Sequence, residues 1–191
     1  MADILYGVKL LVLEELDPAT QLPKAGGAVC RATTGKSAEL EPVISEGEEK
    51  IARSDTHILA IVRTPDLLYG YNLKLVDNAF DVNAAALIEG GVIKTGENGV
   101  VTGYDSAKLA EGATMKPFRA TIYIANYSGD SIVNYVKLIL HKCEGKAPSI
   151  KVGDDFFAPE FEIKAREATK AGLPVKSIEY VDELPAEPAK A

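Results

Sequence analysis

The organisation of the chain is clearest in residues 67–91, where a strand pattern is followed at once by a helix pattern. Residues 67–76 alternate between two faces, and aromatic and branched side chains at period two indicate a strand with one buried face. We expect the inward face to carry Leu67, Tyr69, Tyr71, Leu73 and Leu75.

A short helix is predicted directly after this strand. Asp81 can act as its N-cap, Ala84, Leu87 and Ile88 form a short apolar stripe, and the glycine pair at 90–91 can end it. A helix of about two turns is not stable alone in water. We therefore expect it to lie on a sheet that the preceding strand helps to form.

The rest of the chain reads almost entirely as strands and turns. Residues 118–127 have apolar side chains on both faces, which is typical of a strand in the middle of a sheet. Further strands are expected at residues 8–16, 28–34, 58–64, 132–143, 157–167 and 177–181, with a hairpin at 95–103 around Glu97-Asn98-Gly99. With 16 glycines and ten prolines in 191 residues, the predicted fold class is mainly β: a β-sandwich or barrel with one short flanking α-helix, in a single domain.

Two segments do not fit the core of such a domain. Residues 35–53 contain more acids than bases and few apolar positions, so we expect a solvated hairpin or a long inter-strand loop. A loop of this length is usually either functional or disordered, and if it is ordered we expect it to rest on another molecule. Residues 182–191 are rich in proline and alanine, and we expect them to form an extended C-terminal arm. An extended arm is also expected at the N-terminal end.

Composition narrows the possible functions. The net charge of −7 and the pI near 5.0 argue against tight nucleic-acid binding, which needs clustered lysine and arginine. Two cysteines far apart in sequence do not form a disulfide framework, and we expect buried, reduced thiols. The N-terminus has no basic leader region, and no apolar run approaches the roughly 18 residues of a membrane span. We expect a protein made in a reducing cytoplasm, with no membrane partner.

Motifs for cofactors and metals are incomplete. The sequence Thr34-Gly35-Lys36-Ser37 looks like the end of a phosphate-binding loop, but the glycine that the motif needs five residues before Gly35 is Cys30. His141 and Cys143 share a strand face, yet two ligands are too few for zinc. We therefore predict no cofactor and no metal.

Carboxylate pairs offer the only other candidate chemistry. Asp154 and Asp155, with Glu160 and Glu162 behind them, match no calcium-loop spacing and suit a solvated turn. No nucleophile motif contains either histidine. We predict no catalytic residue and a protein that is not an enzyme.

Two stretches carry a resemblance to a known family. The first is LYGYNL at residues 68–73, followed by Asp77-Asn78 and by the ALIEGG that ends the helix; the second is DDFFAPEFEIKA at residues 154–165. Together they resemble the major tail proteins of long-tailed bacteriophages, over roughly residues 58–168.

The resemblance implies a structural virion protein. Its subunits would close into hexameric rings that stack head to tail into a tail tube, the conduit for DNA during ejection. Expected partners are copies of the chain and the tape-measure, terminator and distal tail proteins, while genomic DNA passes through the lumen without specific binding. The expected location is the virion tail, of the non-contractile siphovirus type, after assembly in the host cytoplasm.

Two sets of residues are candidates for contacts between copies. The inter-ring contact is assigned to the loop at 35–53, and the inter-subunit arm to the C-terminal segment. We expect removal of residues 35–53 to abolish ring stacking while the fold is retained. The alternative function is a β-sandwich binding or decoration module displayed on a virion or cell surface. The candidate loop residues are Glu39, Leu40, Glu41, Val43, Ile44, Glu46, Glu48, Glu49 and Lys50, and the candidate arm residues are Leu184, Pro185 and Pro188.

Overall fold

A computed structural model describes residues 4–106, 115–149 and 158–186. The expected fold class is confirmed: the described chain is mainly β, with one short α-helix. The strands are β1 (Ile4–Glu15), β2 (Val29–Ala32), β3 (Gly35–Ser45), β4 (Glu49–Arg53), β5 (Ile58–Arg63), β6 (Leu67–Asp77), β7 (Val92–Thr95), β8 (Val101–Asp105), β9 (Phe118–Ser128), β10 (Ser131–Gly145), β11 (Glu160–Arg166) and β12 (Lys176–Val181); the helix α1 is Val82–Glu89, and the 3₁₀ turn η1 is Glu97–Gly99.

One antiparallel sheet of eight strands forms the body of the molecule. Its order is β2-β1-β9-β10-β11-β6-β3, and β12 is added beside β10. The long strand β10 has β9 along one edge and two strands in succession along the other. Residues 135–140 pair with β12, and residues 142–145 pair with β11. The sheet curls until the start of β3 packs against β1, where Gly35 lies beside Val8. As predicted, β9 lies in the middle, between β1 and β10.

The main hydrophobic core fills the inside of this curved sheet. The strand expected at 157–167 is present as β11, and alternation places its residues Phe161, Ile163 and Ala165 in the core and leaves Glu162 and Lys164 exposed. In β6 the prediction holds only for its second half: Leu73 and Leu75 are buried. The core also contains Leu11, Leu13, Phe118, Ala120, Ile122, Leu140 and Cys143.

The helix α1 closes one end of the core, and its ends follow the sequence signals. The Asp81 side chain accepts a hydrogen bond from the backbone N–H of Asn83, and Gly90 ends the helix with a left-handed φ of 79°. The helix packs tightly on β10, since a Cβ at Gly145 would overlap Ile88. This close contact gives the two-turn helix the support that it lacks alone.

A second, smaller apolar cluster lies on the other face of β1 and β9. Leu10, Val12 and Tyr123 form it, and Val181 and Leu184 pack against it. The chain after β12 therefore covers the back of the sheet.

The structure corrects two predictions about irregular segments. A long loop at residues 35–53 is wrong, because β3 fills its first half as a strand of the main sheet. The alternative, a solvated hairpin, holds only for the second half, where the exposed strand β4 pairs with β5. The hydrophobic pattern of β3 is weak because it is an edge strand with a solvated outer face, and the same position tolerates Pro42. An N-terminal arm is also wrong from Ile4 onward, because β1 starts there and pairs with β9.

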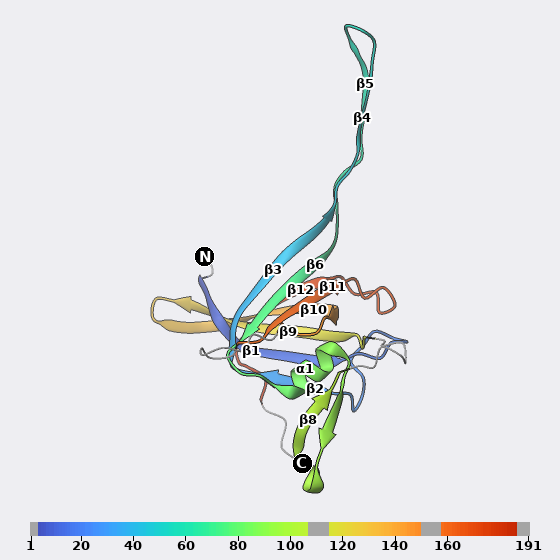
Figure 1. Cartoon of the computed structure of the whole chain (residues 1–191). Coiled ribbons are helices and arrows are strands. Elements are labelled where there is room, and N and C mark those ends of the chain that lie inside the picture. Colours follow the sequence, from blue (N-terminus) through green and yellow to red (C-terminus); the bar gives the residue numbers. More distant parts are fainter. Residues whose placement is uncertain (1–3, 107–114, 150–157, 187–191) are drawn as a thin grey trace.

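Three hairpins project from the body (Figure 1). The β4–β5 hairpin extends furthest, and the β7–β8 hairpin points in the opposite direction. The β9–β10 hairpin projects to one side near the N-terminus, with its turn at residues 129–130. The predicted hairpin around Glu97-Asn98-Gly99 is confirmed at the tip of β7–β8.

Candidate assembly surface

The β4–β5 hairpin and its base, residues 46–66, which we call the arm, expose many apolar side chains. Every residue of β4 and β5 is exposed. The apolar members are Ile51, Ile58, Leu59, Ile61 and Val62, and their exposed fractions run from 49% to 69%. Large aliphatic side chains in such a continuous set are normally covered in a folded protein.

The pairing register places apolar side chains on both faces of the arm. Ile51 lies opposite Ile61, and alternation puts Leu59 on the same face as Ile61. Ala52 lies opposite Ala60, and Val62 shares that other face. The arm therefore presents two apolar faces to its surroundings.

A knee built by hydrogen bonds connects the arm to the sheet. The Asp66 carboxylate accepts from the N–H of Gly47 at 2.8 Å, and the Thr64 hydroxyl accepts from the N–H of Glu48 at 2.8 Å. The Thr64 N–H in turn donates to the Glu48 carbonyl at 3.0 Å. Only glycine fits at position 47, since a Cβ there would overlap the Thr64 carbonyl. These contacts fix the direction in which the arm points.

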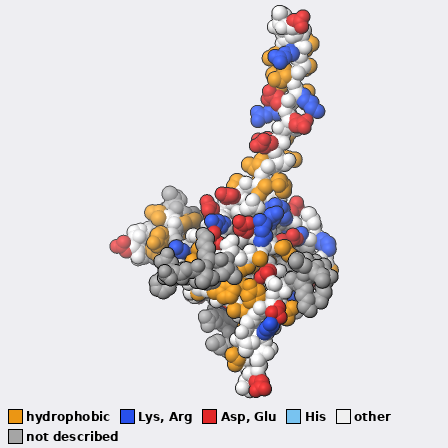
Figure 2. Space-filling model, in the orientation of Figure 1, with side chains coloured by type: hydrophobic (Ala, Val, Ile, Leu, Met, Phe, Trp, Pro, Cys, Tyr) orange, Lys and Arg blue, Asp and Glu red, His pale blue; other side chains and the backbone are white. Residues whose placement is uncertain are grey.

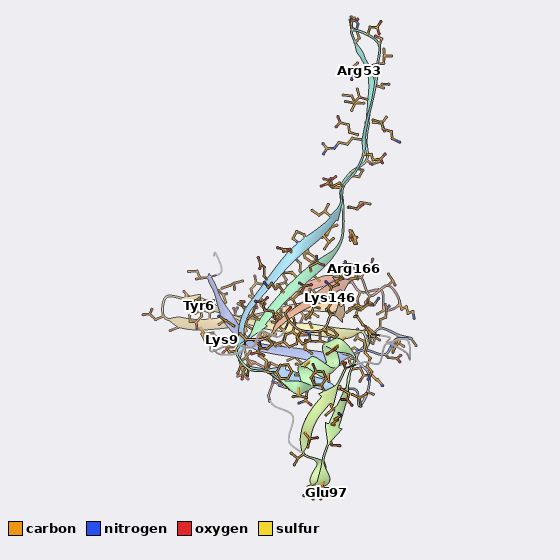
Figure 3. The ribbon with its side chains drawn as sticks, viewed as in Figure 1. Tyr6, Lys9, Arg53, Glu97, Lys146 and Arg166 are labelled. Atoms are coloured by element: carbon orange, nitrogen blue, oxygen red, sulfur yellow. The ribbon has the colours of Figure 1, made fainter. Side chains whose placement is uncertain are left out.

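Below the knee, Arg166 secures the foot of β6. Its guanidinium donates to the carbonyls of Ala165 at 2.8 Å and Tyr71 at 3.3 Å, and it lies over the Tyr69 ring, 5.1 Å from the centroid. Gly70 is needed beside it, because a Cβ would overlap this guanidinium. Figure 3 shows Arg166 at the foot of the arm and Arg53 near its tip. Leu67 and Tyr69, predicted to face inward, are exposed here because β6 has already left the core.

The predicted inter-ring residues are divided between the sheet, the knee and the arm. Only Glu46, Glu48, Glu49 and Lys50 belong to the knee or arm, while the other five lie on β3. Leu40 packs against the core, so it is unavailable to a partner. Sequence reasoning missed the apolar residues of β4 and β5 as contact candidates, although the run ILAIVR at residues 58–63 is visible in the sequence.

Glu39 and Glu41 lie on the outer face of the sheet, where they line a shallow pocket of about 230 Å³. Lysines of neighbouring strands line the same pocket, and Lys146 pairs with Glu162 at 2.7 Å. The hydrogen bond from Lys146 lowers the pKa of Glu162. This face alternates in sign, so it offers no concentrated charge to a ligand.

The predicted C-terminal contact residues have partners within their own chain. Leu184 packs on the smaller apolar cluster, and the Pro185 carbonyl accepts from the Arg31 guanidinium at 2.6 Å. Pro188 lies outside the described residues. An inter-subunit role for this segment stays a prediction.

A second exposed apolar group lies on the side of the molecule. Ile4, Leu5 and Tyr6 at the start of β1 and Ile132 and Val133 at the start of β10 lie on either side of the end of β9, with exposed fractions between 42% and 73%. Tyr6 packs edge-on against the ring of Tyr127, and Lys9 lies over the same ring. This surface points to a different side from the arm (Figure 3).

Burial shifts the pKa values of three side chains near the core, those of Cys30, Cys143 and His141. The Cys30 thiol donates to Asp81 at 3.0 Å, and burial together with this carboxylate raises the pKa of the thiol. Burial raises the pKa of Cys143 to about 12. Both cysteines are free and buried, as predicted. Burial lowers the pKa of His141, whose Nε2 lies 2.8 Å from the Ser177 hydroxyl.

The described residues contain no group of three His, Cys, Asp or Glu side chains placed to hold a metal ion. Asp154 and Asp155 lie outside the described residues, and Lys36 and Ser37 belong to strand β3. Across the described ranges, no helix has the length and apolarity to cross a membrane.

Comparison with known proteins gives no family assignment. No protein-family model matches the chain, and no curated protein matches it.

Proposed function

We propose that this chain is a structural protein of a bacteriophage virion, which assembles into stacked hexameric rings that form the tail tube. The observation that carries the proposal is the arm: an ordered, two-stranded extension with apolar side chains exposed on both faces. The resemblance at residues 68–73 and 154–165 to major tail proteins supports the proposal, and the arm adds a physical reason for self-assembly.

An arm of this kind gains its stability from contact. An isolated two-stranded hairpin is marginally stable in water, because each of its strands has only one neighbour. Contiguous exposed apolar surface on a soluble chain marks an interaction site. Contact with another copy of the chain covers the arm and supplies the missing packing.

Ring closure has its own candidate surfaces. The sheet ends at the edge strands β2 and β3, and the outer edge of β12 has no strand beside it among the described residues. Such edges expose unpaired backbone groups unless another chain covers them. The exposed apolar residues at the start of β1 and β10, which include Tyr6 and Val133, are the candidate contact with a neighbouring subunit of the same ring.

The net negative charge of the chain is consistent with a tube through which DNA passes. A net charge of −7 lets copies of the chain surround DNA without the counterion release that drives tight binding. In this proposal the DNA passes through the lumen, and the tape-measure, terminator and distal tail proteins are the other partners. The site of action is the virion tail, after assembly in the host cytoplasm.

Negative-stain electron microscopy and sedimentation velocity test the proposal on the purified chain. Rings or hollow tubes are expected, with a particle mass that rises with protein concentration. A monodisperse 20.4 kDa species at the highest attainable concentration would refute it and would favour the binding or decoration module.

A deletion locates the stacking contact. Deleting residues 35–53 is unsuitable, because it would remove β3 and the packing of Leu40 from the fold. Excising residues 48–64 and joining the ends through an Asn-Gly turn removes the arm except for the residues at its base and leaves β3 and β6 intact. We expect this variant to keep the thermal unfolding midpoint of the body and to lose tubes.

A further inference from the structure

A buried histidine contacts the strand that leads into the C-terminal segment. His141 of β10 is only 8% exposed, and its Nε2 lies 2.8 Å from the Ser177 hydroxyl of β12. Its other ring nitrogen, Nδ1, is buried with no hydrogen-bond partner among the described residues. In a neutral imidazole Nδ1 can be the nitrogen without a proton, whereas protonation of the ring makes it a charged donor that lacks an acceptor. The site therefore favours the neutral ring.

The charges around His141 also act on its protonation. Arg119 of β9 and Lys137 of β10 oppose the positive ring, while Glu179 of β12 favours it. Glu179 is already paired with Lys137 at 2.7 Å, and Arg119 donates two hydrogen bonds to Glu14 of β1 at 2.6 and 2.8 Å. Burial is the largest cause, and together with Arg119 it lowers the pKa of His141 below its ordinary value of 6.5. The ring therefore binds a proton more readily once it reaches water.

The strand β12 is peripheral, so its detachment would give water access to His141 while the body stays folded. In the described chain β12 pairs only with β10, and Ile178, Glu179 and Tyr180 at its centre are exposed. The main core of the described residues includes none of its six side chains. Segments with few buried apolar contacts open locally at a lower free energy than the core.

We propose that β12 and residues 182–186, which we call the strap, detach from the sheet when His141 takes up a proton. In the closed form Val181 and Leu184 lie on the apolar cluster at the back of the sheet, and the Arg31 guanidinium donates to the Pro185 carbonyl at 2.6 Å. Detachment gives the protonated ring access to water and uncovers this cluster. The strap therefore couples pH to the exposure of an apolar face, whether or not the chain forms tubes.

The expected size of the response follows from proton linkage. In the open form the ring titrates near its ordinary pKa of 6.5, while the closed form needs a lower pH to bind the proton. The closed form is therefore most stable above pH 6.5 and loses stability as the pH falls toward its own lowered pKa. Between pH 7.5 and 5.5 the ratio of open to closed strap should rise roughly three- to tenfold.

Hydrogen–deuterium exchange measured by mass spectrometry on the full, unassembled chain tests the strap. Rates are corrected for the intrinsic effect of pH and expressed as protection factors, with residues 119–125 of β9 as the internal reference. The protection of residues 176–181 should fall roughly three- to tenfold between pH 7.5 and 5.5, while that of β9 stays constant. H141Q should show no such fall.

The chain offers a matched control in its other histidine. His57 lies in the turn between β4 and β5, at the tip of the arm that projects away from the body (Figure 2). It is exposed and has no contact with β12, so H57Q should respond to pH as the unsubstituted protein does. A response that disappears in H57Q and persists in H141Q would refute the assignment.

The remaining outcomes also decide the matter. Equal protection of residues 176–181 at both pH values, or an equal loss in H141Q, overturns the strap. A loss that spreads to β9 overturns it too, because the body then unfolds instead of releasing one strand. If H141Q lacks protection already at pH 7.5, the ring NMR signals of His141, the one histidine left in H57Q, provide the test. Protonation of that ring must accompany the loss of protection, and a protonated ring under a protected strap refutes the proposal.

Discussion

Placing charge on the arm is the most direct perturbation of assembly. Leu59 and Ile61 lie on one face of β5, and neither is covered by its own chain. In the double variant L59D/I61D, the free subunit should keep its stability, because exposed substitutions usually change the free energy of unfolding by less than about 0.5 kcal/mol. The assembled state loses the burial of both side chains.

The expected loss of assembly free energy follows from the exposed fractions of the two side chains in the free subunit. Leu59 is 69% exposed and Ile61 is 56% exposed in the free chain. Full burial of an aliphatic side chain stabilises by about 1.5–3 kcal/mol, so covering these exposed fractions contributes about 2–4 kcal/mol per arm. At about 1.4 kcal/mol for each factor of ten, the critical concentration for tube formation should rise roughly 30-fold or more. Desolvation of the new carboxylates adds to this effect.

Sedimentation of assembled from free protein across a concentration series measures the critical concentration. The matched control is L59M/I61V, which keeps the arm apolar and should assemble close to the unsubstituted level. Thermal unfolding of all three proteins under dissociating conditions shows whether the body is intact. If L59D/I61D assembles at the unsubstituted critical concentration, the arm is not a stacking contact.

Three further variants test the knee, the helix contact and the buried histidine. G47A should weaken assembly and speed amide exchange in residues 48–64 without lowering the unfolding midpoint of the body, because its Cβ would overlap the Thr64 carbonyl. G145A should lower the free energy of unfolding by about 1–3 kcal/mol in urea titrations, since the new methyl group overlaps Ile88 and overpacks the core. Burial lowers the pKa of His141 from 6.5, so the unfolded chain binds the proton more readily, and stability falls as pH drops through 6.5 toward the folded pKa. The unfolding midpoint should therefore fall more between pH 7.5 and 5.5 in the unsubstituted protein than in H141Q; equal losses would contradict this reasoning.

Sequence reasoning succeeded where one local pattern and the tertiary surroundings agree. The alternation of Phe161, Ile163 and Ala165 matches a strand with one buried face, and the structure has it. Asp81 and Gly90 bound the helix because capping depends on neighbouring backbone groups. These features need no knowledge of distant residues.

The same reasoning failed where burial depends on what lies nearby. Leu40 is half-buried on an edge strand whose other face is solvated, so its segment looked like a loop. Leu67 and Tyr69 continue the pattern of β6, but the strand has left the body by then. In the arm, sequence reasoning did not identify residues 58–63 as exposed. An apolar run of this kind has the same sequence pattern whether its own chain covers it or leaves it exposed.

In the proposed assembly, the charged side chains of the arm protect its apolar residues from nonspecific pairing. A bare apolar strand with free edges invites pairing with any other strand. Glu49 and Lys50 on β4, with Arg53 at its end and Arg63 on β5, interleave charge with the apolar positions. Charged side chains along an edge disfavour indiscriminate sheet extension and leave the apolar faces as the adhesive surface.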